Sequence, residues 1–274
     1  MTQKWALVLG SSSGFGGASA VELAKAGFNI IGIHLDRQIT MPNVKAIIKK
    51  IEKTGQKAIF FNMNAADQLK RNDTLDEIKE RFTSKEHPKI NVLIHSLAFG
   101  TLKPFIAKDP ANCVTKAQME MTFDVMANSL VYWTQGLVQR DLLAKKARIF
   151  ALTSAGSQTV FPSYGVVAAA KAALEAHIRQ LAVELGFMGV TANAIMAGVT
   201  ETPALKKIPG NEKMMEAAKA KNPGGRLTTA LDVAKTIVML TDSKADWISG
   251  NVIQVDGGEY IVNYTGEVIC KPFE

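Results

Sequence analysis

The chain has 274 residues, of which 47% are hydrophobic and 21% are charged, an ordinary composition for a soluble globular protein. No apolar run approaches the length that spans a bilayer, so we expect no membrane association. The formal net charge is +7, but the basic residues are dispersed, without an arginine-rich arm or interleaved aromatic residues. We therefore expect no nucleic-acid partner, while an acidic partner or a polyanionic ligand stays possible.

The N-terminus and the cysteines indicate a reducing compartment. The first ten residues, MTQKWALVLG, run directly into a predicted strand and lack the leader, apolar core and cleavage site of a signal peptide. We therefore expect a cytoplasmic protein. Cys113 and Cys270 have no metal-ligand spacing and are too few for a disulfide framework. We expect two unpaired thiols and no metal site.

Short β-branched apolar runs alternate with segments of helical periodicity along the chain. The predicted strands are 5–10, 28–35, 57–63, 90–95, 147–153, 190–196 and 251–256. The predicted helices are 15–26, 43–54, 67–82, 116–140, 164–185, 230–241 and a shorter one near 211–221. This alternation implies βαβ units and an α/β fold, a doubly wound parallel sheet of about seven strands flanked by helices, with 1–274 as a single domain. Ligands of such sheets bind beyond the carboxyl ends of the strands.

A glycine-rich loop follows the first predicted strand. Gly10, Gly14 and Gly16 form G-x-x-x-G-x-G at a strand-to-helix junction. Glycines allow backbone N–H groups to approach a pyrophosphate, which the N-terminus of the following helix also attracts. A plain tight turn is the alternative, but the position in the first βα unit favours dinucleotide binding and a Rossmann-type sheet. Ser12, Ser13 and Phe15 complete the predicted cofactor loop.

The end of the second predicted strand bears on the choice of nicotinamide. It reads HLDR, with His34, Asp36 and Arg37 as candidate contacts of the adenosine ribose. A carboxylate there binds the ribose hydroxyls of NADH, whereas a basic residue favours the phosphate of NADPH. The sequence offers both signs, and we favour NADH over NADPH by a small margin. In the alternative interpretation Asp36 and Arg37 only begin a solvated loop.

A tyrosine and a lysine stand seven residues apart in the stretch 163–181, SYGVVAAAKAALEAHIRQL. On its own, this could be a core helix in which Lys171 reaches solvent and Tyr164 caps the start. However, the glycine loop, this helix, NAIMAG at 193–198 and VDGG at 255–258 occur together and in order. In this combination the chain resembles the short-chain dehydrogenase/reductase superfamily from about residue 4 to residue 260.

The spacing of the tyrosine departs from the general superfamily pattern, Tyr-x-x-x-Lys. Four residues before Lys171 stands Val167, which has no hydroxyl, so Tyr164 makes Tyr-x6-Lys. That spacing, HSLAFG at 95–100 and the sequence after the lysine resemble the enoyl-acyl carrier protein reductases. The general form of the glycine loop resembles a diverged branch of them. On a helix, four residues rise about 6 Å and seven about 10.5 Å. A donor placed further out suits the thioester oxygen of an enoyl substrate.

The resemblance implies an activity, with roles for the two residues. The activity is NAD(P)H-dependent reduction of the trans-2 double bond of enoyl thioesters, in fatty-acid biosynthesis. Lys171 would bind the nicotinamide ribose and supply positive potential, while Tyr164 would hydrogen-bond the thioester oxygen. One alternative is a carbonyl/alcohol oxidoreductase of the same superfamily, of the 3-oxoacyl or hydroxysteroid type. Another is a dinucleotide-binding protein without turnover.

Ser154 is a third candidate catalytic residue, and its assignment is mixed. Many enoyl reductases have a second tyrosine ten residues before the catalytic one, and here Ser154 occupies that position. Counted from Lys171, it also occupies the position of the catalytic serine of the general superfamily. Ser154 either binds the substrate or is a passive hydroxyl at a strand end. Met126 stands near the place of the superfamily's relay asparagine.

The resemblance also extends to residues around the cofactor and the substrate. Asn64, expected to end the third strand, would contact adenine or form a turn, while His95 is expected to be structural. Residues at two further strand ends would line the cofactor: Ser96, Leu97, Ala98, Gly198, Val199, Thr200 and Thr202. The residues expected to contact the substrate are Phe99, Tyr164 and Met214.

Residues 198–226, rich in Gly, Pro and Lys, are expected to form a flap over the substrate. Met214 and Met215 could cover an acyl chain or pack within a helix. The flap is basic through Lys206, Lys207, Lys213, Lys219, Lys221 and Arg226. This charge is either a solvated face or a docking surface for the acyl carrier protein that bears the enoyl group. The resemblance further implies a homotetramer paired through the helices 116–140 and 164–185.

Overall fold

One parallel sheet organises the chain. The computed structural model describes residues 3–82 and 88–263, and Cys270 lies outside them. Within these ranges, seven strands pair in the order β3-β2-β1-β4-β5-β6-β7, every pair parallel. The strands are β1 Lys4–Leu9, β2 Phe28–His34, β3 Ala58–Asn62, β4 Lys89–His95, β5 Leu143–Ser154, β6 Thr191–Ala197 and β7 Val252–Val255. This confirms the predicted α/β class.

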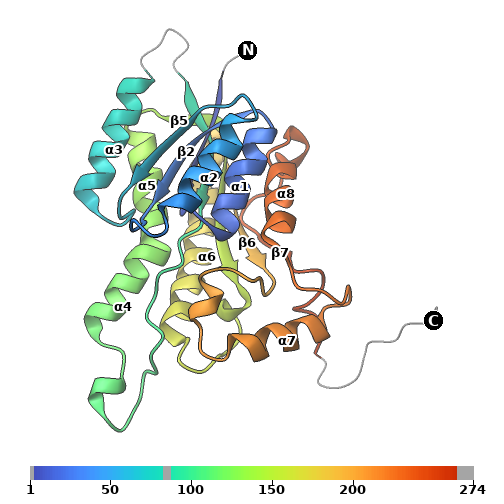
Figure 1. The fold of residues 1–274 in the computed structure, drawn as a ribbon. Coiled ribbons are helices and arrows are strands. Elements are labelled where there is room, and N and C mark those ends of the chain that lie inside the picture. The colour runs from blue at the N-terminus through green and yellow to red at the C-terminus, as the bar shows by residue number, and fades with distance from the viewer. Residues whose placement is uncertain (1–2, 83–87, 264–274) are drawn as a thin grey trace, which may run out of the picture.

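The helices cover both faces of this sheet (Figure 1). One layer holds α1 Gly14–Lys25, α2 Met41–Glu52 and α8 Ala230–Met239, and the other holds α3 Gln68–Arg81, α5 Ser129–Gln139 and α6 Gly165–Leu185. The alternation of side chains along a strand builds the two cores: Leu7 and Leu9 of β1 pack with Trp133 of α5, whereas Ala6 and Val8 pack with Leu23 of α1.

Two helices lie beyond one end of the sheet. They are α4 Lys116–Phe123 and α7 Asn211–Lys221, and Figure 1 shows both extending past the strands, α4 beside the segment that joins β4 to it. The predicted short helix near 211–221 is confirmed in α7. In the part of the chain that the structure describes, no helix combines the length and apolarity needed to cross a bilayer.

The single helix predicted over 116–140 is interrupted. Between α4 and α5 lies a π-helical turn, Asp124–Asn128. The hydroxyl of Ser129 donates to the carbonyl of Val125 at 2.9 Å, and the same hydroxyl contacts the buried ring of His95 at 2.8 Å. Side chains that bond back to the preceding turn distort helices, and single π turns recur at functional sites. A hydrophobic pattern averaged over the segment cannot show this local change.

Candidate active site

The glycine loop lies where the ends of β1, β2 and β4 converge. Gly10 has φ +87°, and a Cβ there would lie 2.3 Å from the carbonyl oxygen of Ser96. At Gly16 a Cβ would lie 2.2 Å from the carbonyl oxygen of Gly10. The loop is held by the amide of Gly10, which donates to Ile33 at 2.8 Å, and by the amide of Ser96, which donates to Leu9 at 2.8 Å. Only glycine fits this cradle, which suits a dinucleotide pyrophosphate.

The N-terminus of α1 opens onto this cradle. Ser13 precedes the helix in an extended conformation and its side chain makes no capping bond, so the first amides of α1 are not satisfied by a cap. A Cβ at Gly14 would lie 3.6 Å from Thr202, which places the loop after β6 beside the glycine loop. Phe15 is half-buried and packs on the apolar layer beneath α1. The Phe15 side chain therefore anchors the glycine loop to this apolar layer.

Asp36 is held beside the loop by several donors. Its carboxylate contacts Nδ1 of buried His34 at 3.0 Å, and its backbone amide donates to Asn62 of β3 at 3.0 Å. Burial acts to raise the pKa of Asp36, but hydrogen bonds from Thr40, Ser12 and His34 outweigh it and lower that pKa. Asp36 is therefore a fixed anion next to Ser12.

The structure gives less support to the other two residues predicted to contact the adenosine end of the cofactor, Arg37 and Asn64. Arg37 is exposed, and its carbonyl accepts from the Thr40 hydroxyl at 3.1 Å. Asn64 was expected to end β3, and this is wrong because the strand ends at Asn62. The side-chain oxygen of exposed Asn64 accepts from the amide of Ala66 at 3.0 Å in a turn. The side-chain oxygen of Asn64 is therefore used in a turn, which was one of the two expectations, and the exposed side chain leaves its NH2 group toward solvent.

Tyr164 stands immediately before α6. Its carbonyl accepts from the amide of Ala168 at 2.9 Å, so it provides the first acceptor of the helix. The ring lies against the backbone of Gly156, where a Cβ would fall 2.6 Å from Cε1, and meets Phe161 edge-on at 5.9 Å between centroids. Burial raises the pKa of the phenol, and the nearby hydroxyl of Ser154 opposes this rise. The phenol is thus a hydrogen-bond donor at neutral pH.

Ser154 ends β5 beside that ring. Its Oγ is buried and makes no hydrogen bond of normal geometry within the described ranges. Buried hydroxyls in proteins usually have a polar neighbour, and here that neighbour is the Tyr164 phenol. Gly156, which the sequence did not single out, is needed because it leaves room for the Tyr164 ring.

Lys171 lies deeper along α6. It is 6% exposed, and its Nζ donates to the carbonyl of Leu152 at 2.6 Å. Burial lowers the pKa of Lys171 to about 8, and the nearby Glu175 acts against this lowering. Val167, one turn before the lysine, is 4% exposed and packs against Met126 of the π turn. The position four residues before Lys171, where the general superfamily pattern has its tyrosine, is therefore occupied by a buried apolar side chain.

His95 ends β4 and contacts the first residue of α5, and residues 96–99 continue the chain from there. His95 is fully buried, and burial lowers its pKa to about 3, with the charge of Lys171 as a smaller cause, so the ring is neutral. Because the Ser129 hydroxyl already donates to Val125, Nε2 of His95 must be the donor toward Ser129. The residues after the strand lie at the rim: Ser96 and Leu97 are half-buried, whereas Ala98 and Phe99 are exposed.

The loop after β6 is fixed by the C-terminal part of the chain. The amide of Val199 donates to the carboxylate of Glu259 at 3.1 Å, and burial raises the pKa of that carboxyl. Thr200 donates to the carbonyl of Gly198 at 3.0 Å, and Thr202 accepts from the amide of Leu205 at 3.2 Å. Of the predicted residues of this loop, Thr202 is the one that lies against the glycine loop in the contacts of the described chain.

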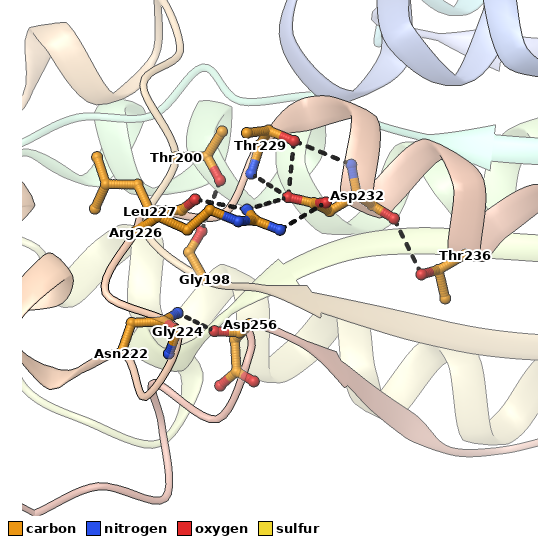
Figure 2. Close-up of polar contacts among 10 residues, drawn as sticks. All are labelled: Gly198, Thr200, Asn222, Gly224, Arg226, Leu227, Thr229, Asp232, Thr236 and Asp256. Carbon is orange, nitrogen blue, oxygen red and sulfur yellow. Dashed lines mark hydrogen bonds and ion pairs between the residues drawn. The ribbon is translucent and has the colours of Figure 1, made fainter. Parts of the chain in front are cut away.

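The distal end of the 198–226 segment is also tied down, as Figure 2 shows. Arg226 forms an ion pair with Asp232 at 2.7 Å, and this lowers the pKa of that carboxyl. Asp232 and Thr229 form a capping box at the start of α8, and Asn222 donates to the carbonyl of Asp256 at 2.7 Å. Arg226 is therefore paired with a carboxylate, and its side chain is exposed, as is that of Lys207.

The middle of the flap packs loosely. In α7 only Ala218 is buried, and Met214 and Met215 are half-buried. Lys206 forms an exposed ion pair with Glu201 at 2.9 Å. The substrate contact expected of Met214 stays a prediction.

Comparison with known proteins supports the cofactor site. The family model described as Enoyl-(Acyl carrier protein) reductase matches residues 10–259. The chain belongs to this family. It is therefore a member of the short-chain dehydrogenase/reductase superfamily and an NAD(P)-dependent oxidoreductase, and the glycine cradle fits the dinucleotide.

Individual relatives point to two kinds of reductase. The chain is 31% identical to the enoyl-acyl-carrier-protein reductase (NADH) of Aquifex aeolicus over 68% of each chain. A crystal structure of an enoyl reductase from that organism matches with a TM-score of 0.82 and 25% identity over 96% of this chain and 99% of the other. The chain is also 29% identical to an NADPH-dependent aldehyde reductase-like chloroplastic protein of Arabidopsis thaliana, over 92% of this chain and 93% of the relative. The chain shares a family with these enoyl reductases, and a shared family does not by itself fix the substrate.

Proposed function

We propose that this reductase saturates the trans-2 double bond of enoyl thioesters. The observation that carries the proposal is the position of the only phenol described beside Lys171. Tyr164 lies just before α6, seven residues from Lys171, while buried Val167 fills the position at which general superfamily members have their tyrosine. Tyr164 is therefore placed further from the lysine than a carbonyl reductase requires.

A reduced nicotinamide held by the glycine loop and Lys171 would supply a hydride to the β-carbon of the enoyl group. Negative charge then develops on the thioester oxygen, and the Tyr164 phenol donates a hydrogen bond to it. The ammonium of Lys171 has hydrogens left after donating to Leu152, and these are free for ribose hydroxyls. Protonation of the α-carbon by solvent completes a saturated thioester.

A second function has one observation in its favour. The buried Ser154 hydroxyl lies next to the Tyr164 phenol, and the carbonyl oxygen of a ketone or aldehyde would be bound at these two groups. In that case Ser154 and Tyr164 together would bind the carbonyl oxygen, and hydride would enter at the carbonyl carbon. The resemblance to an aldehyde reductase-like protein agrees with this alternative.

Matched thioesters separate the two functions. Oxidation of NADH and NADPH is followed with crotonyl and acetoacetyl thioesters of the same carrier, at equal concentrations. We expect kcat/KM to favour the crotonyl thioester by at least about tenfold. Turnover of the acetoacetyl thioester alone would establish the carbonyl function instead. Cofactor binding without turnover of either would leave a binding protein.

We further propose that NADH is the preferred cofactor, because Asp36 is a fixed anion beside the glycine loop. A carboxylate there accepts hydrogen bonds from ribose hydroxyls and repels a 2′-phosphate. Asp36→Ala is expected to lower the ratio of kcat/KM for NADH to that for NADPH by about tenfold, the effect of about 1.4 kcal/mol. Asp73→Ala, at an exposed site on α3, is the matched control. An unchanged ratio for Asp36→Ala would remove this role.

The carrier of the enoyl group is proposed to be acyl carrier protein. Lys207 lies exposed on the flap and forms no ion pair with a carboxylate of the described residues, whereas Lys206 is paired with Glu201 and Arg226 with Asp232. Lys207→Glu is expected to raise KM for a carrier-linked enoyl group about three- to tenfold more than KM for the matching CoA thioester. Lys235→Glu, on exposed α8 surface, is the control. Equal changes in both KM values would argue against docking on the flap.

We also propose that the enzyme is a homotetramer. The helices expected to pair subunits carry exposed apolar side chains, with Val183 78% exposed on α6 and Val138 40% exposed on α5. Burying such side chains against a second copy would remove them from water.

A further inference from the structure

Two oppositely charged side chains lie buried on the same face of α6. Lys171 and Glu175 are each 6% exposed and stand one helical turn apart. Residues four apart on a helix are neighbours, with about 5–6 Å between their Cβ atoms. Neither the motifs of the sequence nor the proposed mechanism uses Glu175.

Consecutive residues of β5 hold the two charges. The carbonyl of Leu152 accepts from Nζ of Lys171 at 2.6 Å, and the hydroxyl of Thr153 donates to Oε1 of Glu175 at 2.6 Å. Thr153 is itself 4% exposed. The end of β5 therefore fixes both side chains of α6 relative to each other.

Within the described ranges no ion pair of 4 Å or less involves Glu175, and the opposite charge that it interacts with is the ammonium of Lys171, one helical turn away. A buried charge is costly unless it is paired or hydrogen-bonded. The Thr153 hydroxyl supplies one hydrogen bond to the carboxylate, and the ammonium supplies the opposite charge.

Other titratable groups around the lysine do not replace this carboxylate. His95 on β4 is neutral, and β6 has no titratable side chain. Asp124 of the π turn faces Arg71. On α6 itself, His177 bonds Asn128 at 3.2 Å, and the Tyr164 phenol is protonated.

We propose that Glu175, held by Thr153, is a positioning residue that provides the buried counter-charge of Lys171 and keeps it an ammonium against the Leu152 carbonyl. This inference rests on the role that the proposed function gives to Lys171. It does not depend on whether the substrate is an enoyl or a carbonyl compound.

The sign of the effect follows from the charges. A neighbouring carboxylate stabilises the ammonium, so its removal lowers the pKa of Lys171 from about 8. At neutral pH a smaller fraction of Lys171 is then an ammonium, and the affinity for NADH begins to fall at a lower pH than in the wild type.

The test measures Lys171 itself. Full-length protein is prepared with 13C-labelled lysine, the Lys171 signal is identified by its loss in Lys171→Arg, and its chemical shift is followed against pH. Glu175→Gln is expected to move the midpoint down by about one pH unit or more, the effect of an opposite charge at 4–6 Å. Glu184→Gln, at an exposed site on the same helix, should leave it unchanged. An unchanged midpoint in Glu175→Gln would overturn the proposal.

Further variants keep the test decisive if Glu175→Gln does not fold. Thr153→Val removes the hydrogen bond to Glu175 at nearly constant volume, and it should lower the same midpoint. Glu175→Asp should restore part of the shift, which a purely structural role would not predict. The pH at which NADH affinity falls by half should follow the NMR midpoint across the variants. Neither readout uses a substrate, so this inference can hold even if the enzyme does not reduce enoyl thioesters. Conversely, wild-type midpoints for Lys171 in the Glu175 and Thr153 variants would refute it even if the enzyme does reduce them.

Discussion

Tyr164→Phe is expected to lower kcat for an enoyl thioester by about 10²- to 10³-fold, the effect of removing one hydrogen-bond donor from a developing oxyanion. The variant keeps the ring that packs against Gly156 and Phe161. It loses only the hydroxyl. Affinity for NADH should therefore stay within about twofold of the wild-type value, because the glycine loop and Lys171 are untouched.

The control for this prediction is another phenol. Tyr132 on α5 packs over Arg71 of α3, with its ring centroid 5.1 Å from the guanidinium carbon. Tyr132→Phe should retain the wild-type kcat. Full activity of Tyr164→Phe in steady-state assays would show that a different group stabilises the thioester oxygen.

Gly10→Ala is expected to destabilise the fold and to abolish tight NADH binding. The residue combines a positive φ with a Cβ position only 2.3 Å from the Ser96 carbonyl oxygen. The left-handed backbone costs about 1–2 kcal/mol for a residue with a Cβ, and the overlap adds about 1–3 kcal/mol. The free energy of unfolding should therefore fall by about 2–5 kcal/mol.

Gly27 separates these two contributions. It has φ +90°, and a Cβ there would meet nothing within 4 Å. Gly27→Ala should lose about 1–2 kcal/mol and keep NADH binding. Urea denaturation and NADH titration measure both effects. An equal loss of stability in the two variants, with NADH bound by both, would show that the approach of Gly10 to Ser96 is not needed.

The sequence was sufficient for the fold because its apolar runs are local signals. Runs such as 28–34 and 90–95 lie largely buried in a parallel sheet that is covered on both faces, so they appear as continuous hydrophobic segments. The glycine loop was equally visible, since positive φ and close backbone contacts at Gly10 leave few other residues possible. The predicted family is confirmed by the family match.

Other features of the site depend on how distant segments align. Asn62 supports Asp36 only because the pairing of β2 with β3 places it opposite His34. Likewise, Thr153 reaches Glu175 because the end of β5 lies beside the middle of α6. No spacing within one segment contains this information. The roles predicted for individual site residues stay predictions until the variants are measured.

The most direct test of the account follows the hydrogen that is transferred. The wild-type enzyme is incubated with NADH deuterated at the transferred position and with a crotonyl thioester, and the product is examined by mass spectrometry and NMR. We predict a butyryl thioester that carries one deuterium on the β-carbon. No saturated product from crotonyl thioester, together with deuterium on the carbinol carbon of a hydroxyacyl product made from acetoacetyl thioester, would contradict it.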